Sequence, residues 1–232
     1  MEENKPSIQE LIDKALEQKG DRIRSGKYSP SSLGKCYRNQ YWNRKNEPIS
    51  NPIDDRTQRV FKAGNLFHSF VQGIIIANHS EAQKEVLVET EDFKGYADLV
   101  VNGEVIDLKS QHSKAFWYRK DLEWKDLEPM LYCNILQVVF YAVQLGKGRA
   151  RLVFISKDDL CIQEYPIEIN YKWEEELRKE IFNLKTFWEK QILPPAIPRA
   201  YPDKEGKPNE CGYCSWKDTC FKLEGWELPK KK

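Results

Sequence analysis

The fold of this chain is decided by residues 96–109, which read YADLVVNGEVIDLK. Asn102-Gly103 is a preferred two-residue turn of a β-hairpin, and the residues on either side of it have the composition of strands. With this pair as the turn, Asp98 on the first strand lies directly opposite Asp107 on the second. The sequence therefore predicts a hairpin that brings two carboxylates together.

The opposed carboxylates predict a cation site. Facing side chains in a hairpin have Cβ atoms about 4.5 to 5.5 Å apart, where like charges are destabilising unless something compensates them. Strand alternation places Lys109 on the same face as Asp107. Two carboxylates suit Mg²⁺ or Mn²⁺, and a lysine beside them can orient a nucleophilic water, which is chemistry suited to phosphodiester hydrolysis. The alternative interpretation is a group of solvated residues on an open sheet face.

Helical and strand-like patterns surround this hairpin. Apolar residues at steps of three and four predict helices, and alternating or β-branched runs predict strands. The longest of the apolar helices contains His68. The chain is therefore of the α/β class with a sheet at its centre. The predicted helices cover residues 7–16, 30–41, 60–75, 129–145 and 170–188, and the predicted strands cover residues 85–89, 96–101, 104–109, 151–156 and 160–169.

The composition is that of a folded globular protein. The chain has 232 residues, of which 40% are hydrophobic and 31% charged. Its formal net charge of +1 excludes attraction of nucleic acid by the molecule as a whole, so any such site has to be local. The longest apolar run, around Ile74 to Ile76, is far shorter than the ~20 residues of a membrane helix. We therefore expect a cytoplasmic protein without a membrane partner.

Four of the six cysteines have the spacing of a metal site. A close C-terminal triplet reads Cys-x₂-Cys-x₅-Cys, and one further cysteine lies far upstream. Four thiolates fit either structural zinc or an iron-sulfur cluster, and the ligand count does not choose between them. The other two, Cys133 and Cys161, lie among apolar residues and are expected to be buried thiols. The four candidate ligands are Cys36, Cys211, Cys214 and Cys220.

Two segments are candidates for contact with nucleic acid. Residues 112–120 mix aromatic rings with cations, and bases can stack on such rings while cations meet phosphates. The alternative is an aromatic segment packed on the domain. A second basic group, Arg22, Arg24 and Lys27, precedes the predicted helix of Cys36, and the sequence does not fix which side of the molecule it faces.

In combination these motifs resemble the PD-(D/E)XK nuclease superfamily and, within it, the RecB-like branch. Residues 95–98 and 105–109, the two sides of the hairpin, resemble the split core motif. His68, within residues 64–68, resembles the upstream histidine of the branch, and residues 137–141 resemble its Gln-x-x-x-Tyr helix. The resemblance leaves out only the first predicted helix and the last dozen residues. It implies a mixed sheet flanked by helices.

The resemblance also implies a role for each residue of the hairpin site. Asp98 and Asp107 would bind Mg²⁺ or Mn²⁺, with His68 and the Leu108 carbonyl as further ligands. Lys109 would position the water that attacks phosphorus. Asp107 stands where many members of the superfamily have Glu, and its shorter side chain is expected to shift the placement of the metal.

Gln137 and Tyr141 lie four residues apart and therefore on one helix face. The resemblance implies that both residues contact the nucleic-acid backbone. Taken alone they would be an ordinary polar pair of a packed helix, and His68 would be a core histidine. Glu85 and Glu89 compete for the acidic position that the superfamily has on the preceding strand.

The cysteine pattern resembles the 4Fe-4S site of RecB-family nucleases, including the CRISPR-associated exonucleases and the AddB-type helicase-nucleases. It implies three regions. Residues 1–55 are an N-terminal helical region that contributes Cys36, residues 56–192 are the nuclease core, and residues 193–232 are the iron-sulfur segment.

We therefore expect a metal-dependent DNA nuclease, with exonuclease activity on single-stranded ends and a stabilising 4Fe-4S cluster. The expected partners are DNA and other DNA-processing or CRISPR adaptation proteins. Two alternatives stay open: a non-cleaving DNA-binding or assembly subunit with structural zinc, and an endonuclease of the same fold.

Overall fold

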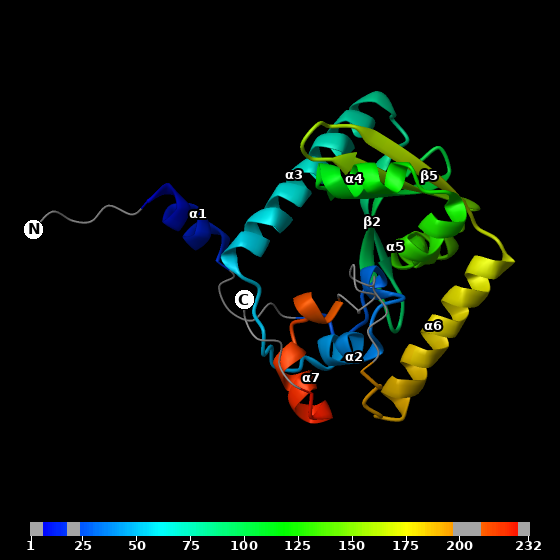
Figure 1. Ribbon diagram of the computed structural model, residues 1–232. Helices are drawn as coiled ribbons and strands as arrows, with labels where there is room; N and C mark the ends of the chain where they lie inside the picture. Colours follow the sequence, from blue (N-terminus) through cyan, green and yellow to red (C-terminus); the bar gives the residue numbers. More distant parts are fainter. Residues whose placement is uncertain (1–6, 18–23, 197–209, 227–232) are drawn as a thin grey trace, which may run out of the picture.

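The computed structural model describes residues 7–17, 24–196 and 210–226. One five-stranded sheet forms its centre, and the strands are adjacent in chain order (Figure 1). The third and fourth strands are parallel, and all other neighbouring pairs are antiparallel. The strands are β1 (Gln83–Glu89), β2 (Lys94–Val101), β3 (Glu104–Gln111), β4 (Arg149–Ser156) and β5 (Ile162–Glu168).

Helices flank this sheet on both sides. The helices are α1 (Ile8–Leu16), α2 (Tyr37–Lys45), α3 (Asp55–Asn78), α4 (Ser113–Lys120), α5 (Trp124–Gln144), α6 (Tyr171–Glu189) and α7 (Lys217–Glu224), with short 3₁₀ segments η1 (Pro30–Ser32) and η2 (Glu210–Tyr213). Helix α3 lies on one side of the sheet, and α5 and α6 lie on the other (Figure 1). The predicted α/β class, with a mixed sheet between helices, is confirmed.

The predicted hairpin is also confirmed. Asn102 and Gly103 have φ values of 51° and 73°, the left-handed conformation that a type I′ turn requires at both positions. The register of β2 and β3 pairs Val101 with Glu104 and continues as far as Leu99 and Ile106. The turn therefore sets the pairing that the sequence indicated.

Several boundaries differ from the prediction, and two of the differences have a local cause. Cys36 is the N-cap of α2 and not part of a helix, because the turn that Pro30 begins ends as η1 before α2 starts at Tyr37. Helix α5 begins at Trp124, ahead of the predicted start at Pro129. Proline near the start of a helix removes one hydrogen-bond donor, and the rest of the helix continues past it.

Each face of the sheet has its own apolar cluster. Leu99 and Leu108 pack with Phe67 and other residues of α3 on one face. On the opposite face, Val105 and Ala150 belong to the main core with the buried residues of α5 and α6. The sheet is therefore covered on both sides, and α3 and α5 approach its centre from opposite directions.

Within the described residues, α3 is the one helix with the length and hydropathy of a membrane span: it has 24 residues, and an 18-residue window within it has a mean hydropathy of 1.2. The sequence prediction counted uninterrupted apolar runs, which α3 lacks because polar residues recur along it. One side of α3 packs Phe67, Val71 and Ile75 against the sheet. Helix α3 therefore resembles a membrane-spanning helix by its length and composition alone.

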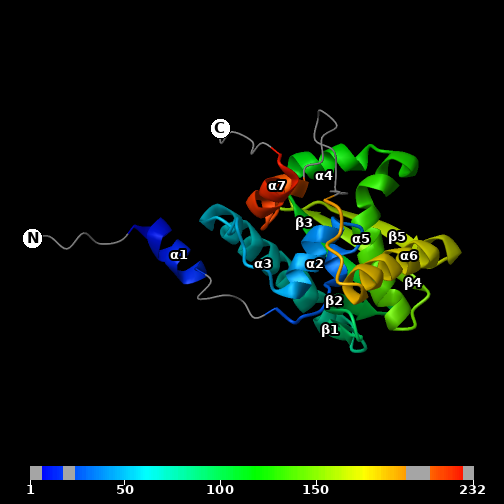
Figure 2. The ribbon, with the colours of Figure 1, turned by 90° about the horizontal axis from the view of Figure 1, so that it is seen from below.

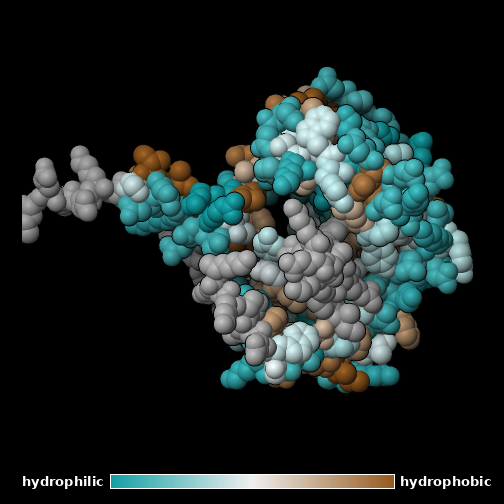
Figure 3. All heavy atoms as spheres, in the orientation of Figure 1, coloured by the Kyte–Doolittle hydropathy of each residue, from teal (hydrophilic) through white to brown (hydrophobic). Residues whose placement is uncertain are grey.

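Helix α1 extends away from the body of the molecule (Figures 1 and 2). Its capping box, Ser7 with Glu10, is formed as predicted. Asp13 forms an ion pair with Arg59 of α3. The hydrophobic residues Ile8 and Leu11 are exposed, and hydrophobic atoms are visible along α1 in Figure 3.

The segment before α2 runs beside the start of β2. The Tyr28 amide donates to the Asp92 carbonyl at 2.8 Å, and the Lys94 amide donates to the Tyr28 carbonyl at 3.0 Å. Tyr28 is buried, and its hydroxyl donates to the Leu184 carbonyl of α6 at 3.0 Å. Residues 24–31 are thereby held close to the strand that carries Asp98.

Candidate active site and cysteine pocket

The sheet opens at Asp98. The ladder between β2 and β3 ends at Leu99 and Ile106, one step short of the predicted pair Asp98 and Asp107. In its place, the Leu108 amide donates to the Asp98 carboxylate at 2.7 Å. The β1–β2 ladder also skips Asp98, because Glu85 opposite it has a φ of 51° and stands outside the pairing. The backbone pairing of β2 with both β1 and β3 is therefore interrupted at Asp98.

Strand β2 changes its facing at the same residue. Ala97 and Leu99 are two apart and would share a face of a regular strand. Ala97 instead belongs to the core on the α5 side, whereas Leu99 belongs to the cluster under α3. The prediction that simple alternation puts Asp98, Asp107 and Lys109 on one face of the hairpin is therefore wrong.

Asp107 lies beneath Lys109. It is only 2% exposed, and the Lys109 Nζ atom lies 2.9 Å from its Oδ1 and 2.7 Å from its Oδ2. The same Nζ donates to Gln137 Oε1 of α5 at 3.2 Å. The ammonium thus compensates the buried carboxylate and connects β3 to the predicted nucleic-acid-contacting helix.

Tyr141, one turn beyond Gln137, contacts β2 at Gly95. A Cβ atom at residue 95 would lie 2.5 Å from the Tyr141 hydroxyl and 2.8 Å from Pro30 Cδ. The Tyr141 oxygen also receives a backbone hydrogen bond from Tyr96. Glycine at position 95 therefore allows α5 and the segment before α2 to approach the strand directly.

Helix α3 contributes His68 and Gln72 from the other side. His68 Nδ1 lies 3.8 Å from Asp98 Oδ2. The buried Gln72 amide donates to Glu85 Oε1 at 2.6 Å and to the Asp98 carbonyl at 3.0 Å. Sequence reasoning missed Gln72, although its spacing of four residues from His68 on a helix was a usable signal. Of the two competing glutamates, Glu85 lies at the site, and Glu89 pairs with lysines at the surface.

These side chains line one cleft of ≈ 890 Å³. It receives residues from α3, β1, β2, β3 and α5, which the sequence placed in separate elements. Asp107 lies below the lining, under Lys109. The lining includes His68, Gln72, Glu85, Asp98, Lys109, Gln137 and Tyr141.

Burial and charge set the protonation of the site. Burial, followed by the negative charge of Asp107, raises the pKa of Asp98 to about 7, against the opposing effects of Lys109 and the Leu108 amide. Burial and the positive charge of Lys109 lower the pKa of His68, which favours a neutral imidazole. Burial and the two aspartates raise the pKa of Tyr141, so its hydroxyl keeps its proton.

The predicted cation ligands are neighbours but do not form a closed set. Across residues 7–17, 24–196 and 210–226, no three histidine, cysteine, aspartate or glutamate side chains converge closely enough to hold one metal ion. The Lys109 ammonium contacts the Asp107 carboxylate. A metal ion bound to that carboxylate would therefore have to compete with the ammonium for the same oxygen atoms. The donor types, two carboxylates and a neutral imidazole, suit Mg²⁺ or Mn²⁺. The role of the Leu108 carbonyl stays a prediction.

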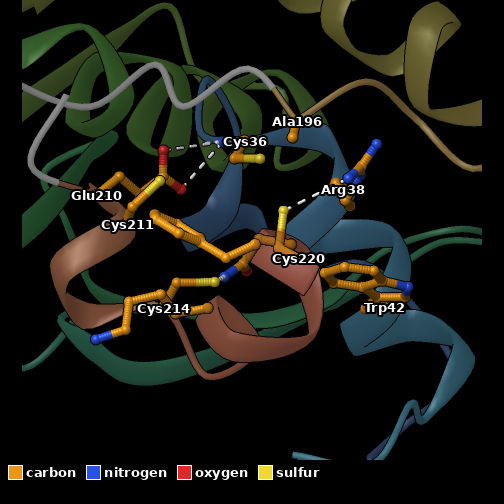
Figure 4. Close-up of a pocket in the computed structure, with 11 residues that line it drawn as sticks. Cys36, Arg38, Trp42, Ala196, Glu210, Cys211, Cys214 and Cys220 are labelled. Atoms are coloured by element: carbon orange, nitrogen blue, oxygen red, sulfur yellow. Dashed lines mark hydrogen bonds between the residues drawn. The ribbon is translucent and has the colours of Figure 1, made fainter. Parts of the chain in front are cut away.

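The four cysteines with ligand spacing do line one pocket (Figure 4). Cys36 comes from the start of α2, Cys211 from η2 and Cys220 from α7, while Cys214 lies between the last two. The Cys36 amide donates to both carboxylate oxygens of Glu210, at 3.0 and 3.1 Å. The cavity between the four thiols measures ≈ 20 Å³.

Hydrogen-bond donors point at two of these sulfur atoms. Asn39 Nδ2 donates to Cys214 Sγ at 3.3 Å, and Arg38 Nη1 donates to Cys220 Sγ at 3.5 Å. Burial raises the pKa of the Cys36 thiol to about 11 and also raises the pKa of Cys214. Without a metal the Cys36 and Cys214 thiols are therefore protonated, and bound metal would favour their thiolates.

The other two cysteines lie outside this pocket. Cys133 of α5 is buried, as predicted. Cys161 is only half-buried and packs against the edge of the main core, because it lies just before β5 begins. Neither lines the cysteine pocket.

Of the two basic segments predicted to contact nucleic acid, only one lines the cleft. Residues 113–120 form α4, where Lys120 lies over the Trp117 ring at 4.5 Å and the Trp117 indole donates to Asp159. Helix α4 does not line the cleft. Arg24 and Lys27 do line it, whereas Arg22 lies outside the described residues.

Arg24 also connects the cleft to the cysteine segment. Its guanidinium lies 5.1 Å from the centre of the Trp216 ring, and its Nη1 donates to the Glu47 carbonyl at 2.9 Å. The Trp216 indole donates to the same carbonyl at 3.1 Å, and its amide donates to Cys214 Sγ at 3.5 Å. One wall of the cleft therefore rests on a residue adjacent to the cysteine pocket.

Comparison with known proteins finds a likeness of fold. No protein-family model matches the chain, and no curated protein matches it. The crystal structure of SSO0001 matches with a TM-score of 0.57 and 18% identity, over 93% of this chain and 96% of that one. The two chains therefore share a fold.

Two further structural neighbours are exonucleases. The alkaline exonuclease LHK-Exo from Laribacter hongkongensis matches with a TM-score of 0.49 and 15% identity, over 73% of this chain and 91% of that one. A phage-related exonuclease from Haemophilus somnus 129PT matches with a TM-score of 0.46 and 14% identity, over 78% and 92%.

Proposed function

We propose that this protein is a divalent-metal-dependent deoxyribonuclease of the RecB-like PD-(D/E)XK type, acting as an exonuclease on single-stranded ends. One observation carries the proposal. His68, Asp98, Lys109, Gln137 and Tyr141 come from four elements and line a single cleft. Unrelated surface or core residues would not be expected to converge on one cleft. The buried Asp107 lies directly below this lining.

The chemistry follows from what each side chain can do. Asp98, Asp107 and His68 would hold Mg²⁺ or Mn²⁺, which would polarise the phosphodiester and lower the pKa of the attacking water. Asp98 gives up its proton near neutral pH, since its pKa is about 7. Lys109, whose ammonium group contacts Asp107 and Gln137, would orient the water.

Gln137 and Tyr141 would position the strand. Both line the cleft from α5, whereas His68 lines it from α3. The Gln137 carbonyl oxygen accepts a hydrogen bond from Lys109, which leaves its amide group able to donate to a phosphate oxygen. Tyr141 keeps a phenolic hydrogen for the same purpose, because its pKa is raised.

We further propose that the cysteine pocket holds a 4Fe-4S cluster. Four thiols gather around one cavity, and N–H groups point at two of the sulfur atoms, as suits anionic cluster ligands. The cavity of ≈ 20 Å³ would widen around the cluster.

The test is cleavage of DNA of defined topology. Linear single-stranded, linear duplex and closed circular DNA are incubated with the iron-loaded protein, with and without Mn²⁺. We expect cutting of the linear single strand only, and only with Mn²⁺. Cutting of circles would replace the exonuclease proposal with an endonuclease.

Two controls complete this test. Lys109→Ala should remove the activity, whereas Lys84→Ala, on the exposed part of β1, should retain it. A folded protein that holds zinc, binds DNA and cuts none of the substrates would support the non-cleaving subunit instead.

A further inference from the structure

The cleft extends beyond the carboxylates along β2. Lys94 and Tyr96 precede Asp98 on this strand, and all three line the cleft. Two residues of a strand span about 6.6 Å, which is close to the length of one nucleotide in an extended single strand. A strand with one phosphate beside Asp98 would therefore place a neighbouring nucleotide beside Tyr96.

The ring of Tyr96 is available for stacking. Tyr96 is 49% exposed, and its cross-strand neighbour Leu87 is half-exposed as well. Among the described residues, no other aromatic ring stacks on it. An uncovered aromatic ring inside a polar cleft is a platform on which a nucleic-acid base can lie.

Three cations of the cleft lining, Arg24, Lys27 and Lys94, suit a phosphate. Lys27 and Lys94 share one carboxylate, Glu89, at 3.0 and 2.9 Å. Arg24 donates to a backbone carbonyl and lies over Trp216, and no carboxylate of the described residues forms an ion pair with it. Arg24, Lys27 and Lys94 therefore leave a net positive charge in the lining, since Glu89 is the one carboxylate of the described residues that pairs with them.

We propose that Tyr96 and Arg24 bind the nucleotide that adjoins the scissile phosphate, with its base on the Tyr96 ring and its phosphate at Arg24. The inference rests on the proposed nuclease function and names the feature that would select single strands. A base within a duplex has no free face to offer Tyr96, whereas a base in a single strand does.

The experiment measures binding and cleavage separately. Binding of a fluorescein-labelled oligothymidylate is followed by anisotropy with EDTA present, and cleavage is followed with Mn²⁺. Tyr96→Ala should weaken binding about tenfold and raise KM with little change in kcat, because stacking on one aromatic residue has this magnitude. Tyr96→Phe keeps the ring and should bind within about twofold of the wild type.

Tyr171→Ala is the matched control. Tyr171 is 72% exposed at the start of α6, outside the cleft and outside both candidate nucleic-acid segments, and its loss should leave binding unchanged. A 2-aminopurine base, placed at each position of the oligonucleotide in turn, supplies a second readout. Its fluorescence should be quenched at one position by the wild type and by Tyr96→Phe, and not by Tyr96→Ala.

Arg24 is tested through salt dependence. Arg24→Gln should weaken binding and reduce the slope of log affinity against log salt by about one, whereas Arg24→Lys should keep the slope. Equal slopes for the wild type and Arg24→Gln would overturn the phosphate contact.

The outcomes separate this inference from the proposed function. Equal binding by Tyr96→Ala and the wild type would overturn the inference while the nuclease proposal stands. Equal weakening by Tyr96→Phe and Tyr96→Ala, or a wild type that binds no oligonucleotide, would overturn it too. A wild type that binds with Tyr96-dependent quenching and cuts nothing would overturn only the nuclease.

Discussion

The main-chain amide of Leu108 donates a 2.7 Å hydrogen bond to the carboxylate of Asp98. This bond crosses from β3 to β2 just where the backbone ladder between them stops. A side-chain oxygen thus takes the place of a backbone acceptor and satisfies an amide that would otherwise lack a partner in the sheet. Because Leu108 lies between Asp107 and Lys109, a shift of β3 would move all of these residues together.

We expect Asp107→Asn to lower the cleavage rate at least about a hundredfold, since it removes a charged metal ligand. The substitution keeps the size of the buried side chain, and Lys109 retains Gln137 as a partner, so the fold should survive. Initial rates on linear single-stranded DNA with Mn²⁺, together with circular dichroism, measure both effects. Asp159→Asn, exposed and outside the cleft, is the control. Full activity of Asp107→Asn would remove this residue from the mechanism.

The pKa of Asp98 makes stability depend on pH. Burial and Asp107 raise it from 3.8 to about 7, so the folded state holds this proton more tightly than the unfolded state. The resulting stabilisation is complete below about pH 3.8 and is lost as the pH rises to about 7. In EDTA, Asp98→Asn should therefore be more stable than the wild type at pH 8. A pKa shift of this size corresponds to about a few kcal/mol in the free energy of unfolding. Near pH 4 the two proteins should be equally stable. Urea unfolding at both pH values tests this, and a difference independent of pH would contradict it.

Gly95→Ala should destabilise the protein by about 1 to 3 kcal/mol and slow cleavage. The new methyl group would lie 2.5 Å from the Tyr141 hydroxyl and 2.8 Å from Pro30, so both neighbours must move. Gly73→Ala is the control, because nothing lies within 4 Å of its added carbon. Adding Tyr141→Phe removes the nearest atom and should recover part of the stability. Thermal unfolding measures the pair, and strict additivity of the two substitutions would show that they do not interact.

Cys214→Ala should remove iron from the purified protein and lower its unfolding midpoint, because metal binding stabilises the fold that brings the thiols together. Iron content, visible absorbance and thermal unfolding are measured on the same sample. Cys161→Ala is the control, since Cys161 lies outside the pocket. Full iron content in Cys214→Ala would show that the cluster has other ligands.

The elements that follow local patterns were predictable. Asn102-Gly103 set the hairpin because its turn type needs two residues with positive φ, and this requirement is independent of the rest of the chain. Helical spacing placed His68 on one long helix and Gln137 and Tyr141 on another, because this spacing too is a property of the local sequence. Cysteine spacing likewise selected the thiols that share a pocket.

What could not be predicted depends on contacts between elements. Strand alternation failed at Asp98 because the strand changes its facing there, and this change follows from the separation of β2 and β3. The burial of Asp107 under Lys109, and the link from Gln72 to Glu85, both require knowledge of how helices pack on the sheet. The position of Arg24 beside the cleft depends on a bridge between Tyr28 and Phe93, far apart in the chain.

The stacking of Arg24 on Trp216 makes the far end of the chain a structural support for the cleft. Both side chains donate to the Glu47 carbonyl, so the guanidinium is held between a backbone oxygen and an indole ring that comes from beyond residue 209. Because the proposed nucleotide contact of Arg24 rests on this ring, proteolytic removal of the C-terminal segment should weaken substrate binding while His68, Asp98 and Asp107 stay intact.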